Sequence, residues 1–387
     1  MMAVLRIMIR EWRRILTLPV FYWLLLVLPP ILFFFYAFIY EKEKVSDLPF
    51  AIWDDSHSSV SRKLTFLLEQ MESIHITHQI ESQLELENLI LKGEVMGAVH
   101  FPVKMEEHMM SGEPVNITLY TNASSLVPAK LMFRNASEVI ITGGAAISLE
   151  KLVQTGMNRG KAMALVQPVR LTTLPLYNPG YNYFQYLVPG LITVALQMII
   201  IMVGVLIFNY EAKTGTKQEL YAIARGSAFR ILLGKMLAHL AVAWINFILV
   251  TGIVFPIFGI WNPAATFHLV VLFTLLAVAC ISIGMLISVI FSDTMLSTDI
   301  ALFYTAPAFV FSGYTFPRWA MPWYDQYYAW VMPYSSFLDG FVKLYQMQLP
   351  FRYALYEMGV LAIFIMVTFP MALLVLRIKI RKEYIVL

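Results

Sequence analysis

The triplet Gly215-Thr216-Lys217 is the first place in the chain where the residue types suggest phosphate chemistry. A phosphate-binding loop requires the pattern Gly-x-x-x-x-Gly-Lys-[Ser/Thr] after a strand, because its backbone N–H groups must surround the phosphates. Here the upstream glycine is missing and a long apolar run, not a strand, precedes the triplet. We therefore expect no ATP hydrolysis by this chain and no cofactor within it.

A second group with possible chemistry is Asp54, Asp55 and His57, whose side chains are those of metal or hydrolytic sites. The group directly follows a predicted strand and precedes a helix that begins near Ser58. We prefer the interpretation of a turn and a helix cap. The chain contains no zinc signature, no nucleophile elbow and no Cys-x-x-Cys pattern. The sequence therefore predicts no catalytic or metal-binding residue.

Two ionisable residues lie within predicted membrane spans, His239 and Asp299. Such residues are expensive in hydrocarbon, so each is either functional or paired. Asp299 lies near the predicted cytoplasmic end of its span and is expected to contact water. His239 precedes Asn246 by two helical turns, which favours a hydrogen-bonding role between helices over a proton relay.

The elements that carry these residues are mostly membrane helices. Hydrophobic residues make up 59% of the chain and charged residues 14%, and the mean hydropathy is +0.68. Soluble domains contain about 25% charged residues. The sequence predicts a polytopic α-helical membrane protein with six transmembrane helices, an N-terminal interfacial helix and an inserted α/β extracytoplasmic domain. The single cysteine, Cys280, excludes a disulfide within the chain.

Residues 1–17 are predicted to form an amphipathic helix in the cytoplasmic interface, with apolar residues on one face and arginines on the other. The apolar face comprises Leu5, Met8, Ile9, Trp12, Ile15 and Leu16, and the basic face comprises Arg6, Arg10, Arg13 and Arg14. Residues 18–40 form the first span, which Pro29-Pro30 interrupts. Because prolines leave helix carbonyls without donors, we expect neighbouring helices to supply them.

Residues 41–180 are predicted to form one small α/β domain with a mixed sheet. Its segments alternate between short runs rich in Val, Ile, Thr and aromatic residues and runs with helical periodicity. The predicted strands are 48–54, 74–78, 97–101, 116–122 and 169–177, and the predicted helices are 58–72, 83–93 and 131–166. His75 and His78 lie on opposite faces of one strand, which argues against a shared metal ion.

Residues 181–387 are predicted to form a block of five spans, with a cytoplasmic loop at 211–230 and an outer re-entrant hairpin at 316–349. Lysine and arginine concentrate in the N-terminal helix, in that loop and in the C-terminal tail, which places both termini in the cytoplasm by the positive-inside rule. Seven aromatic residues of the hairpin suit the membrane interface: Trp319, Trp323, Tyr324, Tyr327, Tyr328, Trp330 and Tyr334.

Three motifs follow one another in this part of the chain. Tyr186-Leu-Val-Pro-Gly190 lies at the start of the second span. Glu211-x-x-x-Gly-Thr216 lies in the cytoplasmic loop, with Gly234-Lys235 at the next span, and the segment from Ser312-Gly313 to Pro333 opens the outer hairpin. In this order they resemble the Tyr-x-x-Pro-Gly motif, the cytoplasmic signature and the outer hairpin of the ABC-2-type export permeases, the membrane subunits of bacterial ABC exporters of the type V fold.

The resemblance implies that the chain is the permease subunit of an ATP-driven exporter in the bacterial inner membrane. The implied partners are ABC ATPase subunits, which would hold ATP and Mg²⁺, a second permease copy or paralogue, and an optional periplasmic adaptor. The residues expected to couple to the ATPase are Glu211, Gly215, Thr216, Lys217 and Leu220. The residues expected to line the path, where the second and fifth spans face their counterparts, are Tyr186, Thr193, Gln197, Thr298, Asp299, Thr305 and Ser312.

Two questions stay open from the sequence. The substrate is not readable, although an apolar path is compatible with amphipathic drugs or lipids. A different class of function is also open, a non-transporting membrane receptor or assembly scaffold with residues 41–180 as its ligand-binding module.

Overall fold

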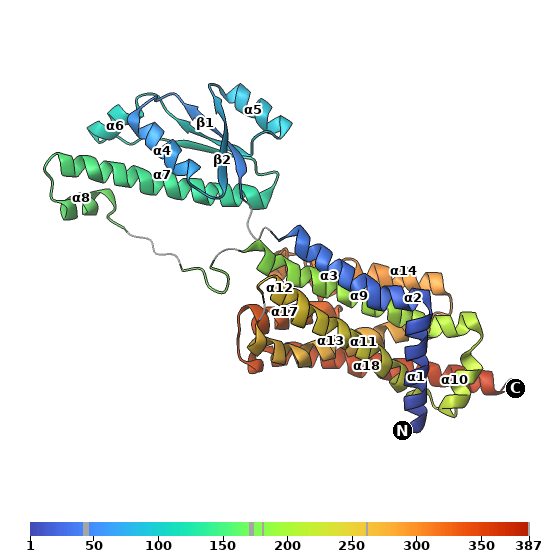
Figure 1. Ribbon diagram of the computed structural model, residues 1–387. Coiled ribbons are helices and arrows are strands. Elements are labelled where there is room, and N and C mark those ends of the chain that lie inside the picture. The colour runs from blue at the N-terminus through green and yellow to red at the C-terminus, as the bar shows by residue number, and fades with distance from the viewer. Residues whose placement is uncertain (42–45, 170–173, 180–181, 261, 386–387) are drawn as a thin grey trace. The chain divides into compact units, whose positions relative to one another are not determined.

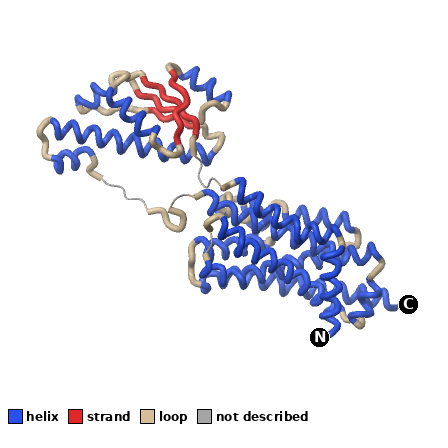
Figure 2. The backbone as a smooth tube through the Cα atoms, viewed as in Figure 1, coloured by secondary structure: helices blue, strands red, loops and turns tan. Residues whose placement is uncertain are grey.

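The computed structural model describes residues 1–41, 46–169, 174–179, 182–260 and 262–385. The chain divides into two compact units, one comprising Met1–Glu43 with Pro175–Leu387 and the other comprising Lys44–Leu174. The first unit is helical, and the second contains the strands (Figures 1 and 2). The two units are described separately below.

Unit Lys44–Leu174 is built on a four-stranded sheet of order β2-β1-β3-β4. The strands are β1 (Leu48–Asp54), β2 (Ile74–Ile80), β3 (Gly97–Phe101) and β4 (Thr118–Thr121). β1 pairs in parallel with β2 and β3, and β4 is antiparallel to β3, so the expected mixed sheet is present. The fifth expected strand, 169–177, lies partly outside the described residues, and residues 174–177 are not extended into a strand.

Helices cover both faces of this sheet because side chains alternate along each strand. Phe50 and Ile52 of β1 pack with α4 (Ser59–Glu69) and α7 (Leu126–Gln154), whereas Ala51 packs with α5 (Gln83–Lys92). α6 (Met105–Ser111) follows β3. The segment 131–166, expected as one helix, is two: α7 ends before Gly156, whose φ is +90°, and α8 (Arg159–Val166) follows.

The helical unit contains six helices that are long and apolar enough to cross a membrane, by length and composition, among the described residues. They extend over Pro19–Ile39, Phe184–Thr214, Ala228–Ile257, Ala265–Ile290, Thr294–Phe311 and Phe351–Lys382. This number agrees with the six predicted spans. α1 (Met2–Thr17) precedes them, and the loop after the second span forms α10 (Lys217–Ala224).

The spans consist of the following elements. The first is α2 (Pro19–Tyr22), the π-helix η1 (Trp23–Val27) and α3 (Leu28–Ile39). The second is α9 (Tyr183–Thr214). The third is α11 (Ala228–Leu249), η2 (Val250–Val254) and α12 (Phe255–Ile257). The fourth is α13 (Pro263–Ile290), the fifth is α14 (Thr294–Thr305) with α15 (Ala308–Phe311), and the sixth is η5 (Phe351–Ala354) with α18 (Leu355–Ile385).

Two prolines within spans each leave the carbonyl four residues earlier without its backbone N–H donor. In both cases a side-chain amide that is distant in the sequence supplies the hydrogen bond. Pro29 lacks the N–H that would bond the Leu25 carbonyl, and Asn246 Nδ2 donates to that oxygen at 3.0 Å. Pro189 leaves the Gln185 carbonyl free, and Gln346 Nε2 donates to it at 3.3 Å. The expectation that neighbouring helices compensate the proline pair is confirmed for Pro29.

Helices α9 and α13 cross at a pair of glycines. A methyl group built on Gly204 would lie 2.9 Å from the Gly284 Cα, so the two backbones touch. Small residues permit such close packing between membrane helices. The α9 segment is also the most enclosed of the six, with 78% of its most apolar window buried, so α9 and α13 form the centre of this unit.

The segment expected as an outer hairpin forms short helices: η3 (Arg318–Ala320), α16 (Trp323–Trp330), α17 (Pro333–Phe341) and the π-helix η4 (Val342–Gln346). Trp319, Trp323, Tyr324, Tyr327 and Trp330 are exposed, in agreement with interface aromatics, and Tyr328 is half-buried. Tyr334 differs, because it is fully buried and its hydroxyl donates to the Gly190 carbonyl at 2.8 Å. It therefore anchors α17 in the core.

Candidate coupling site

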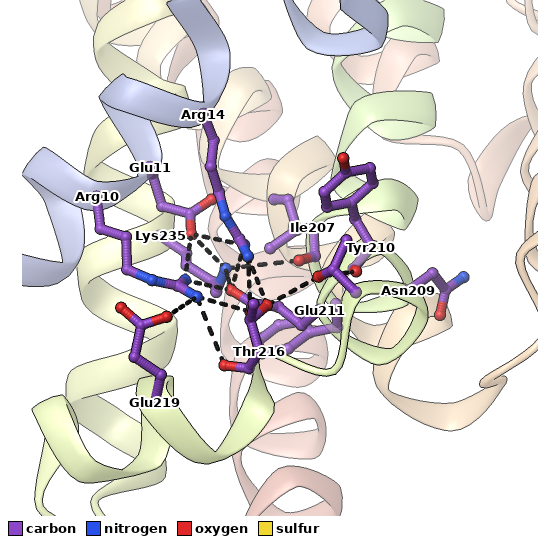
Figure 3. A network of polar contacts seen from close by, with 12 residues as sticks. Arg10, Glu11, Arg14, Ile207, Asn209, Tyr210, Glu211, Thr216, Glu219 and Lys235 are labelled. Carbon is purple, nitrogen blue, oxygen red and sulfur yellow. Dashed lines mark hydrogen bonds and ion pairs between the residues drawn. The ribbon is translucent and has the colours of Figure 1, made fainter. Parts of the chain in front are cut away.

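The candidate site lies where α9 ends, at the junction of four helices. α9 stops at Thr214 because Gly215 adopts a left-handed backbone with φ of +69°, and the N–H of Thr216 returns to the Glu211 carbonyl. α10 begins at Lys217, and Gly226, with φ of +69°, separates it from α11. α1 packs across α10 and α11 at the same place (Figure 3).

The Glu211 carboxylate is the centre of this junction, and its residue is completely buried. Arg10 Nη1 donates to Oε1 at 2.5 Å and Nη2 donates to Oε2 at 3.0 Å, a two-pronged pair. Arg14 contacts both carboxylate oxygens, with Nη2–Oε2 at 2.9 Å. Lys235 Nζ lies 2.8 Å from Oε1. Glu211 thus joins α9 to both α1 and α11.

Thr216, in the loop that follows α9, also binds the Glu211 carboxylate. Its hydroxyl donates to Glu211 Oε2 at 2.5 Å and accepts from Arg14 Nη2 at 2.7 Å. Its carbonyl lies 3.5 Å from Arg10 Nη2. The Glu-x-x-x-Gly-Thr signature therefore has a geometric reason: the left-handed glycine reverses the chain and returns the threonine to the glutamate one turn earlier.

A second buried carboxylate, Glu11 of α1, shares Lys235 with Glu211. Lys235 Nζ lies 2.5 Å from Glu11 Oε1, and His239 Nε2 lies 3.7 Å from Oε2. Burial alone would raise the pKa of Glu11, but the adjacent Lys235 ammonium group and the neighbouring His239 ring lower it to about 2. Glu11 is therefore charged at neutral pH, as a partner of the buried ammonium group.

The charges of the junction balance. Arg10, Arg14 and Lys235 supply three positive charges, and Glu11, Glu211 and Glu219 supply three negative ones. Glu219 is the member at the rim: its side chain is 59% exposed and lies 3.3 Å from Arg10 Nη2. Removal of one charged side chain from such a buried network strongly destabilises the folded state, because its partner stays buried with an uncompensated charge.

The predicted coupling residues separate into buried and accessible groups. Glu211 and Leu220 are buried, Thr216 and Lys217 are half-buried, and Gly215 is exposed. Glu211 pairs with the N-terminal helix α1, and its burial leaves no surface for a partner protein. The exposed residues of the loop are Lys213, Thr214, Gly215, Gln218, Glu219, Ala222, Arg225, Gly226 and Phe229.

The predicted path residues also differ in burial. Gln197, Thr193, Thr305 and Ser312 are buried in the protomer, Thr298 is half-buried, and Tyr186 and Asp299 are exposed. The hydroxyls of Thr193, Thr298, Thr305 and Ser312 donate to carbonyls three or four residues earlier in their own helices. Their role in a path stays a prediction.

Tyr186 is fixed at the start of α9 by the hairpin. Its ring stacks on Tyr314 with centroids 4.9 Å apart, and each hydroxyl donates to the other residue's carbonyl oxygen. Gln346 Nε2 donates to the Tyr314 hydroxyl at 2.9 Å. Together with the bond from Gln346 to Gln185, these contacts explain the residue types in the Tyr-x-x-Pro-Gly motif.

Sequence reasoning missed Glu11 and the pairing of Lys235. Glu11 is the one acidic residue in a helix with four arginines, which was an available signal. Its importance depends on Lys235, 224 residues later, and no local pattern connects the two. The basic face is also divided: Arg10 and Arg14 point into the junction, while Arg6 and Arg13 are exposed.

The residues singled out elsewhere have structural roles. Asp54 Oδ1 accepts from the N–H groups of Ser56 and His57, and Ser58 caps α4, which confirms the turn-and-cap interpretation. Within the described ranges no three His, Cys, Asp or Glu side chains lie close enough to hold a metal ion. The hydrogen bond expected of His239 is not formed. Its buried ring nitrogens neither accept nor donate one within the part of the chain that the structure describes, and Nε2 lies 3.7 Å from Glu11 Oε2.

Comparison with known proteins agrees with this architecture. The sequence profile described as "ABC-2 family transporter protein" matches residues 19–374. The chain is 24% identical over 340 residues to the protein named "Probable multidrug ABC transporter permease YbhR" of Escherichia coli strain K12, which covers 87% of this chain and 85% of that protein. The protein of the same name in Escherichia coli O157:H7 matches with the same identity and coverage.

Proposed function

The chain belongs to the ABC-2 family of transporter proteins, and from this premise we propose that it is the permease subunit of an ATP-driven exporter. A separate ABC ATPase hydrolyses ATP, and this chain forms the membrane part. A second permease copy or a paralogue completes the path. The observation that carries the proposal is the buried junction at Glu211, which ties the loop 211–230 to α1 and α11.

The junction is suited to transmit force from a cytoplasmic partner. The exposed surface of α10 offers a site for the ATPase, while Glu211 fixes the loop to three helices at once. A displacement of α10 without α1 and α11 would break several charged hydrogen bonds in a buried place, which is costly. The elements therefore move together, and motion of the ATPase reaches the spans.

The proposed orientation places this loop, α1 and the C-terminal tail in the cytoplasm. The basic residues Arg6, Arg13, Lys213 and Arg225 are exposed around the junction, as the positive-inside rule requires. Unit Lys44–Leu174 then lies on the opposite side of the inner membrane, between the first two spans. In that position it is available to a periplasmic adaptor.

For the substrate we propose an amphipathic compound. The support is the related permease of Escherichia coli, which is named as a probable multidrug ABC transporter permease. The helical unit offers mainly hydrocarbon surface, which suits compounds that partition into the membrane.

A loop-surface variant with a matched control tests the proposal. Ala222 is exposed on α10, and Ala123 is exposed in a turn of the other unit. Ala222→Arg is expected to abolish ATP-dependent ethidium efflux and to prevent co-purification of an ATP-hydrolysing subunit. Ala123→Arg is expected to preserve both. Efflux and ATPase recovery that stay unchanged in Ala222→Arg would contradict the placement of the ATPase on α10. Absence of both from the unaltered protein would contradict the exporter proposal and favour the receptor or scaffold alternative.

A further inference from the structure

His239 of α11 is a buried imidazole whose two ring nitrogens form no hydrogen bond within the described part of the chain. Only 4% of the residue is exposed. A buried N–H group without an acceptor destabilises the folded state, and native proteins keep few such groups. An apolar side chain of similar shape would avoid this cost. The presence of an imidazole therefore requires an explanation from its surroundings.

The acceptor that faces this ring is a carboxylate of α1. His239 Nε2 lies 3.7 Å from Glu11 Oε2, whereas a hydrogen bond between these groups has a length of about 2.9 Å. On its other side the ring neighbours Phe21 of α2, with ring centroids 6.3 Å apart. The distance to the carboxylate is thus about 0.8 Å too long for a bond. A small movement of the two side chains closes it.

The two oxygens of the Glu11 carboxylate are used unequally. Lys235 Nζ lies 2.5 Å from Oε1, and guanidinium nitrogens of Arg14 and Arg10 lie 3.4 and 3.6 Å from the same oxygen. Oε2 is the oxygen that faces His239. The carboxylate therefore presents its less crowded oxygen to the imidazole.

Lys235, which lies closest to Glu11, is shared with a second carboxylate. Its ammonium group lies 2.5 Å from Glu11 Oε1 and 2.8 Å from Glu211 Oε1, so one cation joins α1 to α9 (Figure 3). The side chain of lysine is flexible, and its ammonium group carries three donors. A movement of the loop at Glu211 would draw this ammonium group away from Glu11. The buried Glu11 carboxylate would then lose its closest cation, which is costly.

His239 is placed to compensate for that loss. It follows Lys235 by four residues on α11, and side chains at this spacing are neighbours on one side of a helix. The contacts of α1 with α11 on either side of Glu11 are apolar, since Ile7 lies against Gly234 and Ile15 packs in one cluster with Val242. These contacts supply no donor, and the imidazole is the group that faces Oε2.

We propose that His239 is a reserve hydrogen-bond donor for Glu11. When Lys235 follows Glu211, the Nε2–H group of His239 binds Glu11 Oε2 and keeps α1 attached to α11. His239 is a positioning residue, because it acts through Glu11 rather than on a substrate. The exchange of donors needs only this chain. Its use during transport rests on the proposed function, in which the ATPase moves the loop.

The test compares thermal unfolding of variants of the full-length protein in detergent at pH 8, where the imidazole of histidine is mostly neutral. In otherwise unaltered protein, His239→Phe replaces an unbonded imidazole by an apolar ring, and the unfolding temperature is expected to stay the same or to rise. In Lys235→Met the imidazole binds Glu11, and the same replacement is expected to lower the unfolding temperature by about 2 °C. The effect therefore changes sign between the two backgrounds.

A second background without Lys235 protects the test against misfolding. Lys235→Met/Glu211→Gln removes one positive and one negative charge of the same ion pair, so the charges of the junction still balance. His239→Phe is expected to lower the unfolding temperature of this protein as well.

Two amide variants form a matched pair of controls. In His239→Gln the amide nitrogen reaches the position of Nε2, and in His239→Asn it reaches only that of Nδ1. In both backgrounds without Lys235, glutamine is expected to preserve the unfolding temperature and asparagine to lower it as phenylalanine does.

Three results would overturn the proposal. A loss of equal size from His239→Phe in all backgrounds would show that the ring serves packing alone. No loss in any background would show that His239 never binds Glu11. Equal stability of the glutamine and asparagine variants would contradict a hydrogen bond from Nε2. These measurements need no ATPase, so such results would leave the exporter proposal in place.

Discussion

The Asn246 side chain donates its amide N–H to the carbonyl oxygen of Leu25 at 3.0 Å. The bond joins the third span to the first, and the two residues are 221 positions apart in the chain. The same amide group lies 3.1 Å from the Val242 carbonyl of its own helix. Because Pro29 leaves the Leu25 oxygen without its helical partner, this bond replaces a backbone hydrogen bond with a side-chain one. The third span therefore stabilises the break in the first.

Replacing Asn246 by leucine is expected to destabilise the protein by about 1–2 kcal/mol, because a buried carbonyl loses its donor. The same substitution in a Pro29→Ala background is expected to cost less, because an alanine at this position restores the backbone N–H. Thermal unfolding in detergent of the four proteins of this double-mutant cycle measures the difference. Additive losses of stability would contradict the inference that Asn246 stabilises the protein by donating to the Leu25 carbonyl.

Removal of the Glu211 carboxylate is expected to lower the free energy of unfolding strongly, although Glu211 belongs to the motif of a loop. The sequence predicts only a coupling role for Glu211, whereas its buried contacts to Arg10, Arg14 and Lys235 make the carboxylate part of the folded core. We expect a loss of about 3–5 kcal/mol, typical of a broken buried ion pair.

The matched control is Glu219→Ala, which removes a carboxylate with a 59% exposed side chain from the rim of the same network. The expected loss is at most about 1 kcal/mol. Urea or thermal unfolding of both variants gives the comparison. Equal losses would mean that burial does not separate the two carboxylates energetically.

The depressed pKa of Glu11 predicts a dependence of stability on pH. Its ordinary value is 4.5 and its value in the folded protein is about 2, so the folded state favours the charged form. The resulting stabilisation is fully present above pH 4.5 and is lost as the pH falls towards 2. Glu11→Gln lacks this group, so its unfolding temperature should differ most from that of the wild type at neutral pH.

Measuring both proteins from pH 7 down to the lowest pH at which the wild type stays folded should show the difference narrowing below about pH 4.5. A difference that grows on acidification would have the wrong sign and would remove Glu11 from the network.

The side of the membrane occupied by unit Lys44–Leu174 is open to direct labelling. Ser111 is exposed at the end of α6, and Cys280 is completely buried. Ser111→Cys with Cys280→Ser should react with an impermeant thiol reagent in intact cells whose outer membrane has been permeabilised. Labelling that requires lysis of the inner membrane would reverse the proposed orientation.

Local patterns predicted most of the elements. The strands 48–54 and 97–101 and the helix 83–93 appear with their bounds nearly unchanged, because alternation and helical periodicity act over short distances. The six spans follow from hydropathy for the same reason. The division of the segment 131–166 at Gly156 depends on one left-handed residue that periodicity does not register.

The candidate site was predictable in place but not in geometry. The Glu-x-x-x-Gly-Thr pattern located the loop, yet the partners of Glu211 come from residues 10, 14 and 235. Which arginines of α1 turn inward depends on how that helix packs on α11, where a methyl group on Gly234 would lie 2.8 Å from Ile7 Cβ. Tyr334 illustrates the same limit, since an aromatic residue suits both an interface and a core.

The backbone contact between Gly204 and Gly284 restricts how this protein can change shape. With no side chains between them, α9 and α13 have no room to approach further, and a separation would open a void along the middle of the unit. We therefore expect α9 and α13 to stay packed together in any change of conformation. We expect conformational changes of the membrane unit to occur mainly in α3, α14 and α18, which belong to the least enclosed spans and pack around the α9–α13 pair.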